Sequence, residues 1–537
     1  LLERGPIEDT REELAAAIRE LGADAVPIIP DTEAVPKRLG PLRSDLEGKG
    51  LILLGDLHTN RALFPFYASY YTCADARYPG GSGYELRTVV RPFGRAGNCL
   101  VVGASTQEGI TTGVRRLIER LKSLRRGRTV RLPYVLEVRL GEELAGLLGP
   151  ATAELERDAR IEAEAWNCGE ALAAFTRNAH LYFYTGDERF ARRARAGALR
   201  AADCDKDAPG FGVGDYTMEN LAAAWRRVSC SGAFSAADRA AIDGAMYRTL
   251  GVHSRSWWRI RPEDGIGNRH QTTGGLAFWT LVRVMRELGT PDGAARARLE
   301  EWYKEAEAYC DGLLRHYWDD EDDYQSPDSA QNAASYAMQA GRMAWFEGGL
   351  ARRAAERLVM TVDNLGWYAG MGGYGDALPG WERFPQDAGM LMGACAFVYE
   401  DGGYLWVLER FATLTDSWGS LQPWGLHQFE TGGRIRAVKP AWVEGLGVAR
   451  FTPYRLDRIN SGEFLRTVIM DGFRVAGLRA RPVAAEQAYD KLCWRSGTEA
   501  DDLYFLLQGS AGSTLTTVDM NAIIRLTEAG KLWLVHN

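Results

Sequence analysis

The chain has 537 residues, of which 46% are hydrophobic and 25% charged, the composition of a globular protein with enough apolar material for several cores. No apolar run approaches the roughly 18 residues that a membrane helix needs, so we expect no membrane span. The 64 Lys and Arg residues are outnumbered by 71 Asp and Glu, which gives a formal net charge of −7. Nucleic-acid-binding proteins usually carry a basic surplus, so we expect no nucleic-acid partner.

Residues 1–135 are predicted to form an α/β domain. Two amphipathic stretches, 11–21 and 110–124, predict helices, and short apolar runs bounded by Gly, Pro or Asp predict strands. Because the two kinds of element alternate, we expect a mainly parallel sheet. The predicted strands cover residues 23–30, 50–56, 84–91 and 98–104, with a further extended segment at 133–141.

The middle of the chain, residues 150–420, has the periodicity of long amphipathic helices separated by loops rich in Gly, Asp and Pro. Ten such helices imply about five helical hairpins, and hairpins repeated over this length commonly close into a solenoid or toroid with one cleft. We therefore predict an incomplete (α/α) toroid. Its helices are expected at 155–178, 186–203, 217–229, 235–250, 272–288, 296–317, 329–346, 349–364, 384–400 and 403–416.

After residue 430 the helical period stops, and short strand-like runs separated by turn residues predict an antiparallel β-sandwich at 430–537. The last run reaches the final residue, which leaves a truncated sandwich among the expectations. The predicted fold class is thus multidomain α+β. The strand-like runs cover residues 443–451, 467–480, 502–510, 521–527 and 531–537.

The eight cysteines are widely scattered and form neither a CxxC pair nor a Cys/His cluster. This pattern argues against structural zinc and against a dense disulfide framework. A few disulfides in a secreted protein and eight buried free thiols both stay open as alternatives.

The segment 253–275 contains the densest group of candidate binding residues. It holds Trp257, Trp258 and the loop 267–271, and within 253–271 four arginines, including Arg261, oppose only two acids. A basic, aromatic loop in an acidic protein is a candidate docking place for an anionic sugar. In the alternative interpretation, the arginines pair with surface carboxylates and the tryptophans fill a helix-pair core.

Within this segment, NRHQTTGGLAFW (268–279) opens a predicted helix after a glycine loop. It resembles the Asn/His element of heparinase II/III-like and alginate-lyase-like polysaccharide lyases. The predicted order of a helical toroid and a β-sandwich is similar to the same superfamily, and the likeness covers roughly 155–537. The first 135 residues instead resemble accessory domains that precede catalytic modules of some glycoside hydrolases.

The resemblance implies a secreted or periplasmic enzyme that cleaves an acidic, uronate-containing polysaccharide, such as a glycosaminoglycan, alginate or ulvan, by β-elimination. That reaction needs a group that neutralises the carboxylate, a base for the C5 proton and an acid for the departing O4. The resemblance assigns neutralisation to Asn268 and Arg269, and neutralisation or base chemistry to His270. Tyr324, 54 residues after His270 in an acidic loop, would be base and acid. No metal or other cofactor is required by this chemistry.

The chain departs from the family pattern near the tyrosine. The family usually places its Tyr after a Ser/Pro element, which corresponds here to Asp328, Ser329 and Asn332. Tyr324 precedes that element and Tyr336 follows it, so both stay candidates.

Two further departures concern histidine. Arg269 separates Asn268 from His270, whereas relatives often have Asn and His adjacent. The β-domain His expected near 514–521 is replaced by threonine, which leaves His427 as the candidate second imidazole.

The substrate-binding set completes the hypothesis, with tryptophans stacking on sugar rings. Its members are Trp257, Trp258, Arg261, Gln271, Tyr336, Trp367, Tyr374 and Trp381.

Two other functions compete with the lyase. Asp376, Glu382 and Asp387 lie among aromatic residues, and paired carboxylates of this kind serve glycoside hydrolases, although helix caps look the same. Glu219 is similarly ambiguous. A non-catalytic protein that binds an acidic glycan is the second alternative, because the β-domain His is missing. The acidic run 319–323 fails the spacing of a calcium loop and is interpreted as a solvated loop.

Overall fold

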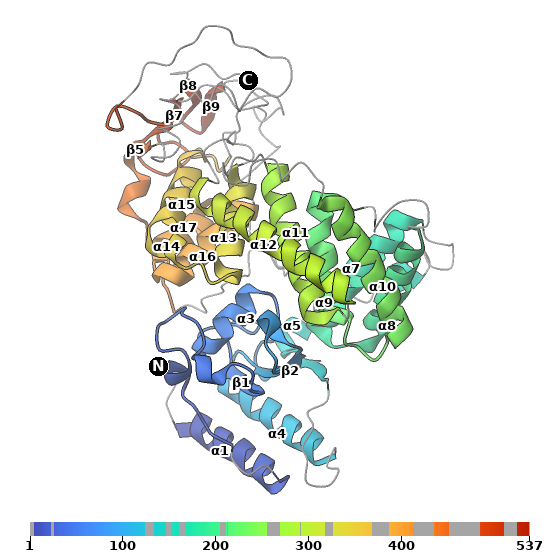
Figure 1. The fold of residues 1–537 in the computed structure, drawn as a ribbon. Helices are drawn as coiled ribbons and strands as arrows, with labels where there is room; N and C mark the ends of the chain where they lie inside the picture. Colours follow the sequence, from blue (N-terminus) through green and yellow to red (C-terminus); the bar gives the residue numbers. More distant parts are fainter. Residues whose placement is uncertain are drawn as a thin grey trace. The chain divides into compact units, whose positions relative to one another are not determined.

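The computed structural model describes residues 5–22, 26–123, 134–145, 153, 155–159, 167–204, 211, 213–254, 269–289, 292–316, 326–367, 386–411, 434–450, 484–509 and 523–535. The chain divides into two compact units, and Figure 1 draws their helices and strands. The first contains residues 1–256, 277–304 and 429–432, and the second contains 257–276, 305–428 and 433–537. Helices and two separate sheets make the fold mixed α+β, as the sequence predicts.

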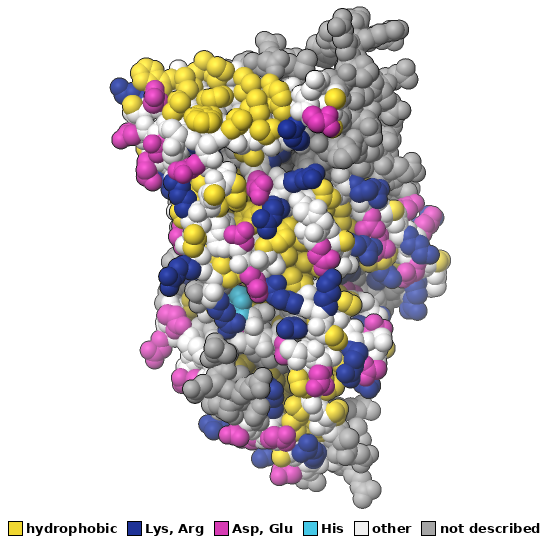
Figure 2. All heavy atoms as spheres, turned by 90° about the vertical axis from the view of Figure 1, so that its left-hand side faces the viewer, with side chains coloured by type: hydrophobic (Ala, Val, Ile, Leu, Met, Phe, Trp, Pro, Cys, Tyr) yellow, Lys and Arg dark blue, Asp and Glu magenta, His cyan; other side chains and the backbone are white. Residues whose placement is uncertain are grey.

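The surface carries charges of both signs. On the face shown in Figure 2, Lys and Arg side chains are interspersed with Asp and Glu among the described residues. This mixing agrees with the nearly balanced charge count of the sequence.

The first unit begins with a four-stranded sheet and its helices. The strands β1 (Leu51–Gly55), β2 (Tyr84–Val89), β3 (Cys99–Gly103) and β4 (Leu136–Arg139) confirm four predicted extended segments. The helices α1 (Gly5–Glu20) and α4 (Gln107–Ser123) confirm the two predicted helices. Shorter elements are α2 (Asp31–Ala34), η1 (Ser44–Leu46), η2 (Arg61–Leu63), α3 (Phe64–Ala68), η3 (Pro92–Gly94) and α5 (Glu142–Ala145).

The prediction of a mainly parallel sheet is wrong. The strand order is β1-β3-β2-β4, and only β1 and β3 run parallel, whereas β2 pairs antiparallel with both β3 and β4. The reason is the length of the connection from β2 to β3, because residues 90–98 are too few for the crossover that a parallel pair needs.

The predicted strand at 23–30 is also wrong over its described part. Residues 26–30 belong to neither helix nor strand. Pro27 and Pro30 fall inside this run, and proline has no N–H to donate to a β ladder. The run was predicted as a strand from its apolar residues, but its prolines prevent strand pairing.

Both faces of this sheet are buried. On one face, Leu100 and Val102 of β3 pack in a cluster with Leu14 of α1 and Leu117 of α4. On the other face, the cluster around Val101 contains residues from η2 and α3. Two buried faces explain the continuous apolar sequence of β3.

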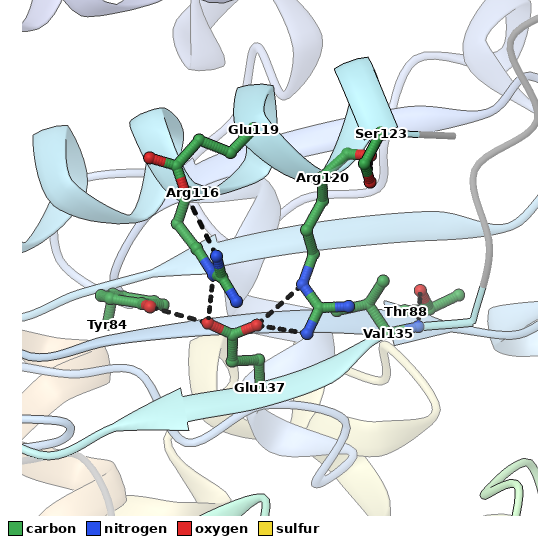
Figure 3. A network of polar contacts seen from close by, with 8 residues as sticks. All are labelled: Tyr84, Thr88, Arg116, Glu119, Arg120, Ser123, Val135 and Glu137. Carbon is green, nitrogen blue, oxygen red and sulfur yellow. Dashed lines mark hydrogen bonds and ion pairs between the residues drawn. The ribbon is translucent and has the colours of Figure 1, made fainter. Parts of the chain in front are cut away.

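Glu137 of β4 joins the sheet edge to α4 (Figure 3). Its carboxylate accepts hydrogen bonds from Arg116 Nε at 2.7 Å, Arg120 Nε at 2.7 Å and the Tyr84 hydroxyl at 2.8 Å. Burial by itself raises the pKa of Glu137, but the bonds from Arg116, Tyr84 and Arg120 outweigh it and lower the pKa below its ordinary value. The ionised carboxylate therefore ties β4 to α4 at neutral pH.

Long helices follow in both units and confirm most of the predicted middle region. In the first unit these are α7 (Cys168–Thr185), α8 (Glu188–Asp203), α9 (Asp215–Val228) and α10 (Ala236–His253), and α11 (Arg269–Leu288) and α12 (Gly293–His316) have residues in both units. The second unit contains α13 (Ser326–Gln339), α14 (Ala344–Glu347), α15 (Leu350–Met360), α16 (Gln386–Tyr399) and α17 (Gly402–Phe411).

One predicted helix, 155–178, is interrupted. Asn167 has an extended backbone, and its side chain accepts a hydrogen bond from the Glu170 N–H at 2.9 Å, while the Glu170 carboxylate accepts one from the Asn167 N–H. This capping box starts α7 at Cys168. The local capping signal overrides the apolar periodicity that suggested one continuous helix.

A disulfide joins Cys168, the first residue of α7, to Cys204, the residue that caps the end of α8, with 5.9 Å between the Cα atoms. The pair closes the open end of the α7–α8 hairpin. The six other cysteines are free. The disulfide contradicts the alternative of eight buried free thiols, and four of the six free cysteines are buried.

The second unit also contains a five-stranded antiparallel sheet. Its strands, in spatial and sequence order, are β5 (Gly445–Ala449), β6 (Lys491–Arg495), β7 (Tyr504–Gln508), β8 (Ile523–Glu528) and β9 (Lys531–Val535). Four of the predicted runs contain strands, the run at 467–480 lies outside the described residues, and β6 was not predicted. β6 begins and ends with charged residues, so its sequence does not look like that of a buried strand. Both residues, Lys491 and Arg495, are nevertheless buried.

This sheet carries apolar side chains on both faces. Cys493, Tyr504, Leu506 and Ile524 form a core with Met360 of α15 on one face. The register aligns Leu446, Trp494, Phe505, Leu526 and Leu534 across the five strands, and the first two and the last of these are exposed. Figure 2 shows apolar side chains gathered at the top of the view, where the molecule carries this sheet.

Among the described helices, none combines the length and the apolarity that crossing a membrane requires.

The disulfide gives the first testable prediction. Replacing both Cys168 and Cys204 by Ser should lower the free energy of unfolding by about 3–4 kcal/mol, because the bond closes a loop of 36 residues in the unfolded chain. Denaturant unfolding of parent and variant measures the difference. A reducing agent should lower the midpoint of the parent and leave the double variant unchanged; an unaffected parent would contradict the prediction.

Candidate functional site

The first turn of α11 contains three of the residues that the sequence assigns to the site. The helix begins at Arg269, so His270 and Gln271 follow as its second and third residues. This agrees with the expectation that the motif 268–279 opens a helix. The first backbone N–H groups of a helix lack partners within the helix, and the helix dipole is positive there. The position therefore favours a negatively charged group.

A buried polar network joins this turn to α13. Asn332 Nδ2 donates hydrogen bonds to Thr272 Oγ1 at 3.2 Å and to Thr273 Oγ1 at 3.0 Å. The hydroxyls of Thr272 and Ser329 lie 3.2 Å apart. All four side chains are buried. Buried hydrogen bonds between side chains fix geometry closely, because losing a partner leaves a desolvated polar group.

The network brings two helix starts together. Thr272 is the fourth residue of α11 and Ser329 is the fourth residue of α13, so the N-terminal ends of both helices lie side by side. Tyr324 stands two positions before the first residue of α13 in the sequence. The helix start that contains His270 and the Ser/Pro element are therefore neighbours in the second unit. The sequence relates these two elements only through the family resemblance.

Gly275 allows α12 to approach α11 closely. A Cβ atom at this position would lie 2.2 Å from Cε1 of the Tyr309 ring, which is buried in α12. The two threonines and the glycine of the motif thus have packing roles in this structure. They position the start of α11, which contains Arg269, His270 and Gln271.

Tyr336, one of the two candidate tyrosines, is fully buried in α13. Its hydroxyl donates to Asp311 Oδ1 at 2.9 Å and lies 3.3 Å from the Glu307 carbonyl oxygen. Arg342 Nε donates to the same Asp311 oxygen at 2.9 Å. Burial, with the nearby Cys310 and Asp311, raises the pKa of the Tyr336 phenol well above its ordinary value. The hydroxyl is held by α12 in its protonated form.

Trp367 lies at the end of a turn organised by Asp363. The Asp363 Oδ1 atom accepts hydrogen bonds from the Leu365 and Trp367 N–H groups, both at 2.9 Å. The Asp363 Oδ2 atom accepts from Arg525 Nε of β8 at 2.8 Å. One carboxylate therefore fixes the backbone of a candidate stacking residue and attaches it to the sheet. The Trp367 side chain is half-buried.

The remaining predicted site residues lie outside the described part of the chain. They are Trp257, Trp258, Arg261, Asn268, Tyr324, Tyr374, Trp381 and His427, together with Asp376 and Glu382 of the hydrolase hypothesis. For Arg269, His270, Gln271 and Asp387 the structure describes the helical position but not the side chain.

Glu219 of α9, in the first unit, is the carboxyl group whose role the sequence leaves ambiguous. Its side chain is half-buried, and burial raises the pKa of its carboxyl group to about 7. A carboxyl group with such a pKa exchanges its proton near neutral pH, which is a property of catalytic acids and bases. The sequence left this residue ambiguous, because nothing in its local pattern reports burial.

No group of three or more His, Cys, Asp or Glu side chains within the described ranges is arranged to hold a metal ion. The chain was compared with models of protein families and with curated proteins, and neither comparison produced a match. The candidate site consequently rests on its own residues and contacts.

Mutation of Asn332 tests the hydrogen bonds between α11 and α13. Asn332→Ala removes the donor shared by Thr272 and Thr273 and should cost about 1–3 kcal/mol of unfolding free energy, because the hydroxyls lose their buried partner. Amide hydrogen exchange of residues 269–276 should become faster, since the start of α11 loses two of its hydrogen bonds to α13.

Gln339→Ala is the matched control for this variant. It also removes a buried amide from α13, but that amide bonds Ser335 of the same helix at 2.9 Å. Exchange of residues 269–276 should stay at the parent rate in this control. Equal acceleration in both variants would show that the Asn332 bonds do not hold the start of α11.

Proposed function

We propose that the protein is a polysaccharide lyase that cleaves an acidic, uronate-containing glycan by β-elimination. The observation that carries the proposal is the buried contact of Thr272, Ser329 and Asn332, which places the start of α11 beside the start of α13. The reaction needs a carboxylate-binding element and a proton-transfer element within one substrate length. The motifs at 268–279 and 319–332 provide these two elements.

The proposal includes a toroidal arrangement of the helices. Its support is the packing of alternate helices within each unit, which hairpins arranged in a ring require. In the first unit α7 packs against α8 and α9, and α10 packs against α8. In the second unit α16 packs against α13, α15 and α17.

The proposed sandwich is supported by the β5–β9 sheet. A sandwich needs a sheet with apolar residues on the face toward its partner sheet. Beyond the face that packs on α15, this sheet has a second apolar face, which includes Leu446 and Trp494.

In this function, the first turn of α11 neutralises the uronate carboxylate. Asn268, Arg269 and His270 supply hydrogen-bond donors there, and the helix dipole adds to the attraction. Neutralisation makes the C5 proton more acidic, because negative charge that develops during its removal is stabilised. The substrate-binding aromatic residues, Trp257, Trp258, Trp367, Tyr374 and Trp381, stack on sugar rings.

Tyr324 is the proposed base and acid. A tyrosine that removes a proton must itself reach the ionised form, which a raised pKa opposes. The Tyr336 hydroxyl is bonded to Asp311, and its pKa is raised, so Tyr336 suits a structural role. The raised pKa of Tyr336 supports the assignment of the base and acid to Tyr324 in the proposal.

A secreted or periplasmic location accompanies the proposal. Disulfides persist mainly in oxidising compartments, and the bond between Cys168 and Cys204 supports such a location. Large acidic polysaccharides are also found outside cells, so location and substrate are consistent with each other.

The direct test is incubation of the protein with hyaluronan, chondroitin, heparin, alginate and ulvan. A lyase generates unsaturated products that absorb in the near ultraviolet. His270→Ala should reduce turnover at least ~100-fold, because one proton-transfer or neutralising group is lost, while the melting temperature stays nearly unchanged.

Other results would assign another function. New reducing ends without ultraviolet absorbance would indicate a glycoside hydrolase. Saturable binding without any product would indicate a glycan-binding protein. A stable His270→Ala variant with parental turnover would show that the start of α11 is not the site.

The two tyrosines give a matched pair of variants. Tyr324→Phe should lower turnover at least ~100-fold and leave stability unchanged, because it removes the base. Tyr336→Phe should keep turnover within a few-fold and lower the unfolding free energy by about 1–2 kcal/mol, because it removes the bond to Asp311. Initial rates and denaturant unfolding measure both effects. The opposite pattern would exchange the two roles.

A further inference from the structure

The first unit contains a buried arginine without a carboxylate partner among the described residues. Arg227, near the end of α9, is 7% exposed. Its Nη1 atom lies 3.0 Å from Nδ1 of His180, whereas Nε and Nη2 have no hydrogen-bond partner among the described groups. A buried charge that lacks compensation is strongly destabilising. A negatively charged partner would therefore stabilise the buried guanidinium.

Deprotonation does not relieve this cost. Burial lowers the pKa of Arg227. A guanidinium nevertheless keeps its proton at neutral pH, because its ordinary pKa lies so high. Arg227 is consequently a cation inside the first unit.

The neighbouring arginines are already paired. Arg87 and Arg227 both lie over the Phe183 ring, with their Cζ atoms 3.8 Å and 4.9 Å from its centroid. Arg87 donates to Glu85 Oε2 from Nε at 3.0 Å and from Nη2 at 2.7 Å. Its Nη2 atom also donates to the Phe183 carbonyl oxygen at 2.7 Å. Glu85 is thus engaged by Arg87 and is not a partner for Arg227.

A second pairing excludes the other nearby carboxylate. Glu287 accepts hydrogen bonds from Arg226 Nη2 at 3.2 Å and from Arg283 Nε at 3.1 Å. Arg226, Arg283 and Glu287 are all buried. Together with Arg87, Arg227 and Glu85, the group contains four guanidinium cations and two carboxylates. The region has an excess of positive charge.

A cavity of about 40 Å³ lies among these side chains. Arg87, Arg226, Arg227 and Glu287 line it together with aromatic residues that include Tyr134. This volume is about three times the ~10–15 Å³ that one water molecule needs. The cavity has room for a small ion, and three of its charged lining groups are cations.

The two unpaired donors of Arg227, Nε and Nη2, are the atoms with which other arginines of this protein bind carboxylates. Arg286 holds Glu300 with Nε at 2.8 Å and Nη2 at 2.9 Å. Arg195 holds Asp238 with the same two atoms, at 2.8 Å and 3.0 Å. These parallel N–H groups match two oxygens of a carboxylate, phosphate or sulfate. In Arg227 the same two atoms donate no hydrogen bond to a described group.

We propose that this cavity binds a small inorganic oxyanion, phosphate or sulfate, through Nε and Nη2 of Arg227. The bound anion offsets the buried positive charge between the N-terminal sheet and the helices α7 and α9 of the first unit. This site is independent of the proposed lyase chemistry, because it lies in the first unit and the first turn of α11 lies in the second.

The test is calorimetric titration of the full chain with sodium phosphate, sodium sulfate and sodium chloride at constant ionic strength. Phosphate or sulfate should bind saturably with one site per chain. Chloride should bind at least about tenfold more weakly, because one spherical ion meets the two parallel N–H groups at bent angles, whereas two oxygens accept them in nearly straight bonds. Equal binding of chloride would overturn the oxyanion assignment.

Arg227→Met removes the two donors and should weaken oxyanion binding at least about tenfold. Arg298→Met is the matched control, because it removes an exposed arginine whose ion pair with Glu301 lies on the surface, and it should keep the parental affinity. Parental affinity in Arg227→Met would overturn the proposal.

Equilibrium dialysis of the unmodified protein with labelled phosphate and labelled sulfate gives a measurement that does not depend on the folding of a variant. It should show close to one bound oxyanion per chain, displaced by unlabelled phosphate or sulfate but not by chloride at the same ionic strength. Absence of saturable binding of both anions to the unmodified chain would overturn the proposal.

Discussion

The ion pair between Asp363 and Arg525 is the interaction on which the second unit depends. Both side chains are buried, and the Asp363 carboxylate also accepts hydrogen bonds from the backbone of the turn that ends at Trp367. Two charges removed from water are stable only when their geometry is good and their remaining oxygens are bonded. Asp363 satisfies this condition on both oxygens. Breaking the pair would leave a buried charge and remove a direct link between β8 and the turn that ends at Trp367.

The residues of the candidate site differ in burial and in the roles proposed for them. Buried residues with little chemistry of their own, Thr272, Asn332 and Gly275, set the position of two helix starts. The polar residues proposed for the reaction stand at or before those starts, where backbone N–H groups are open to an anion. A rigid support of this kind keeps reacting groups in place, because the second layer of side chains restrains the first.

Buried arginines occur in both units, and their partners determine what each one does. Arg357 of α15 is matched by Asp490, which precedes β6, at 2.6 Å, and Arg87 is matched by Glu85 of the same strand, β2. Arg227 lacks such a carboxylate among the described residues, and its environment is electrostatically unbalanced. The same guanidinium chemistry therefore gives a structural pair where a carboxylate is present and a candidate anion site where it is not.

The sequence by itself determined the kind and approximate place of most elements, because apolar periodicity and capping residues act locally. It also indicated that 268–279 opens a helix. Tertiary structure decided what local signals do not contain. The short connection between β2 and β3 made that strand pair antiparallel. The strand β6 forms because its buried charged residues have partners. Residues 26–30 form no strand, because proline lacks an N–H donor. Only the packed chain showed that Tyr336 is bonded to Asp311 and that Thr272 meets Ser329, 57 residues later. Burial and contacts between distant residues arise when the chain folds, and no local window of sequence records them.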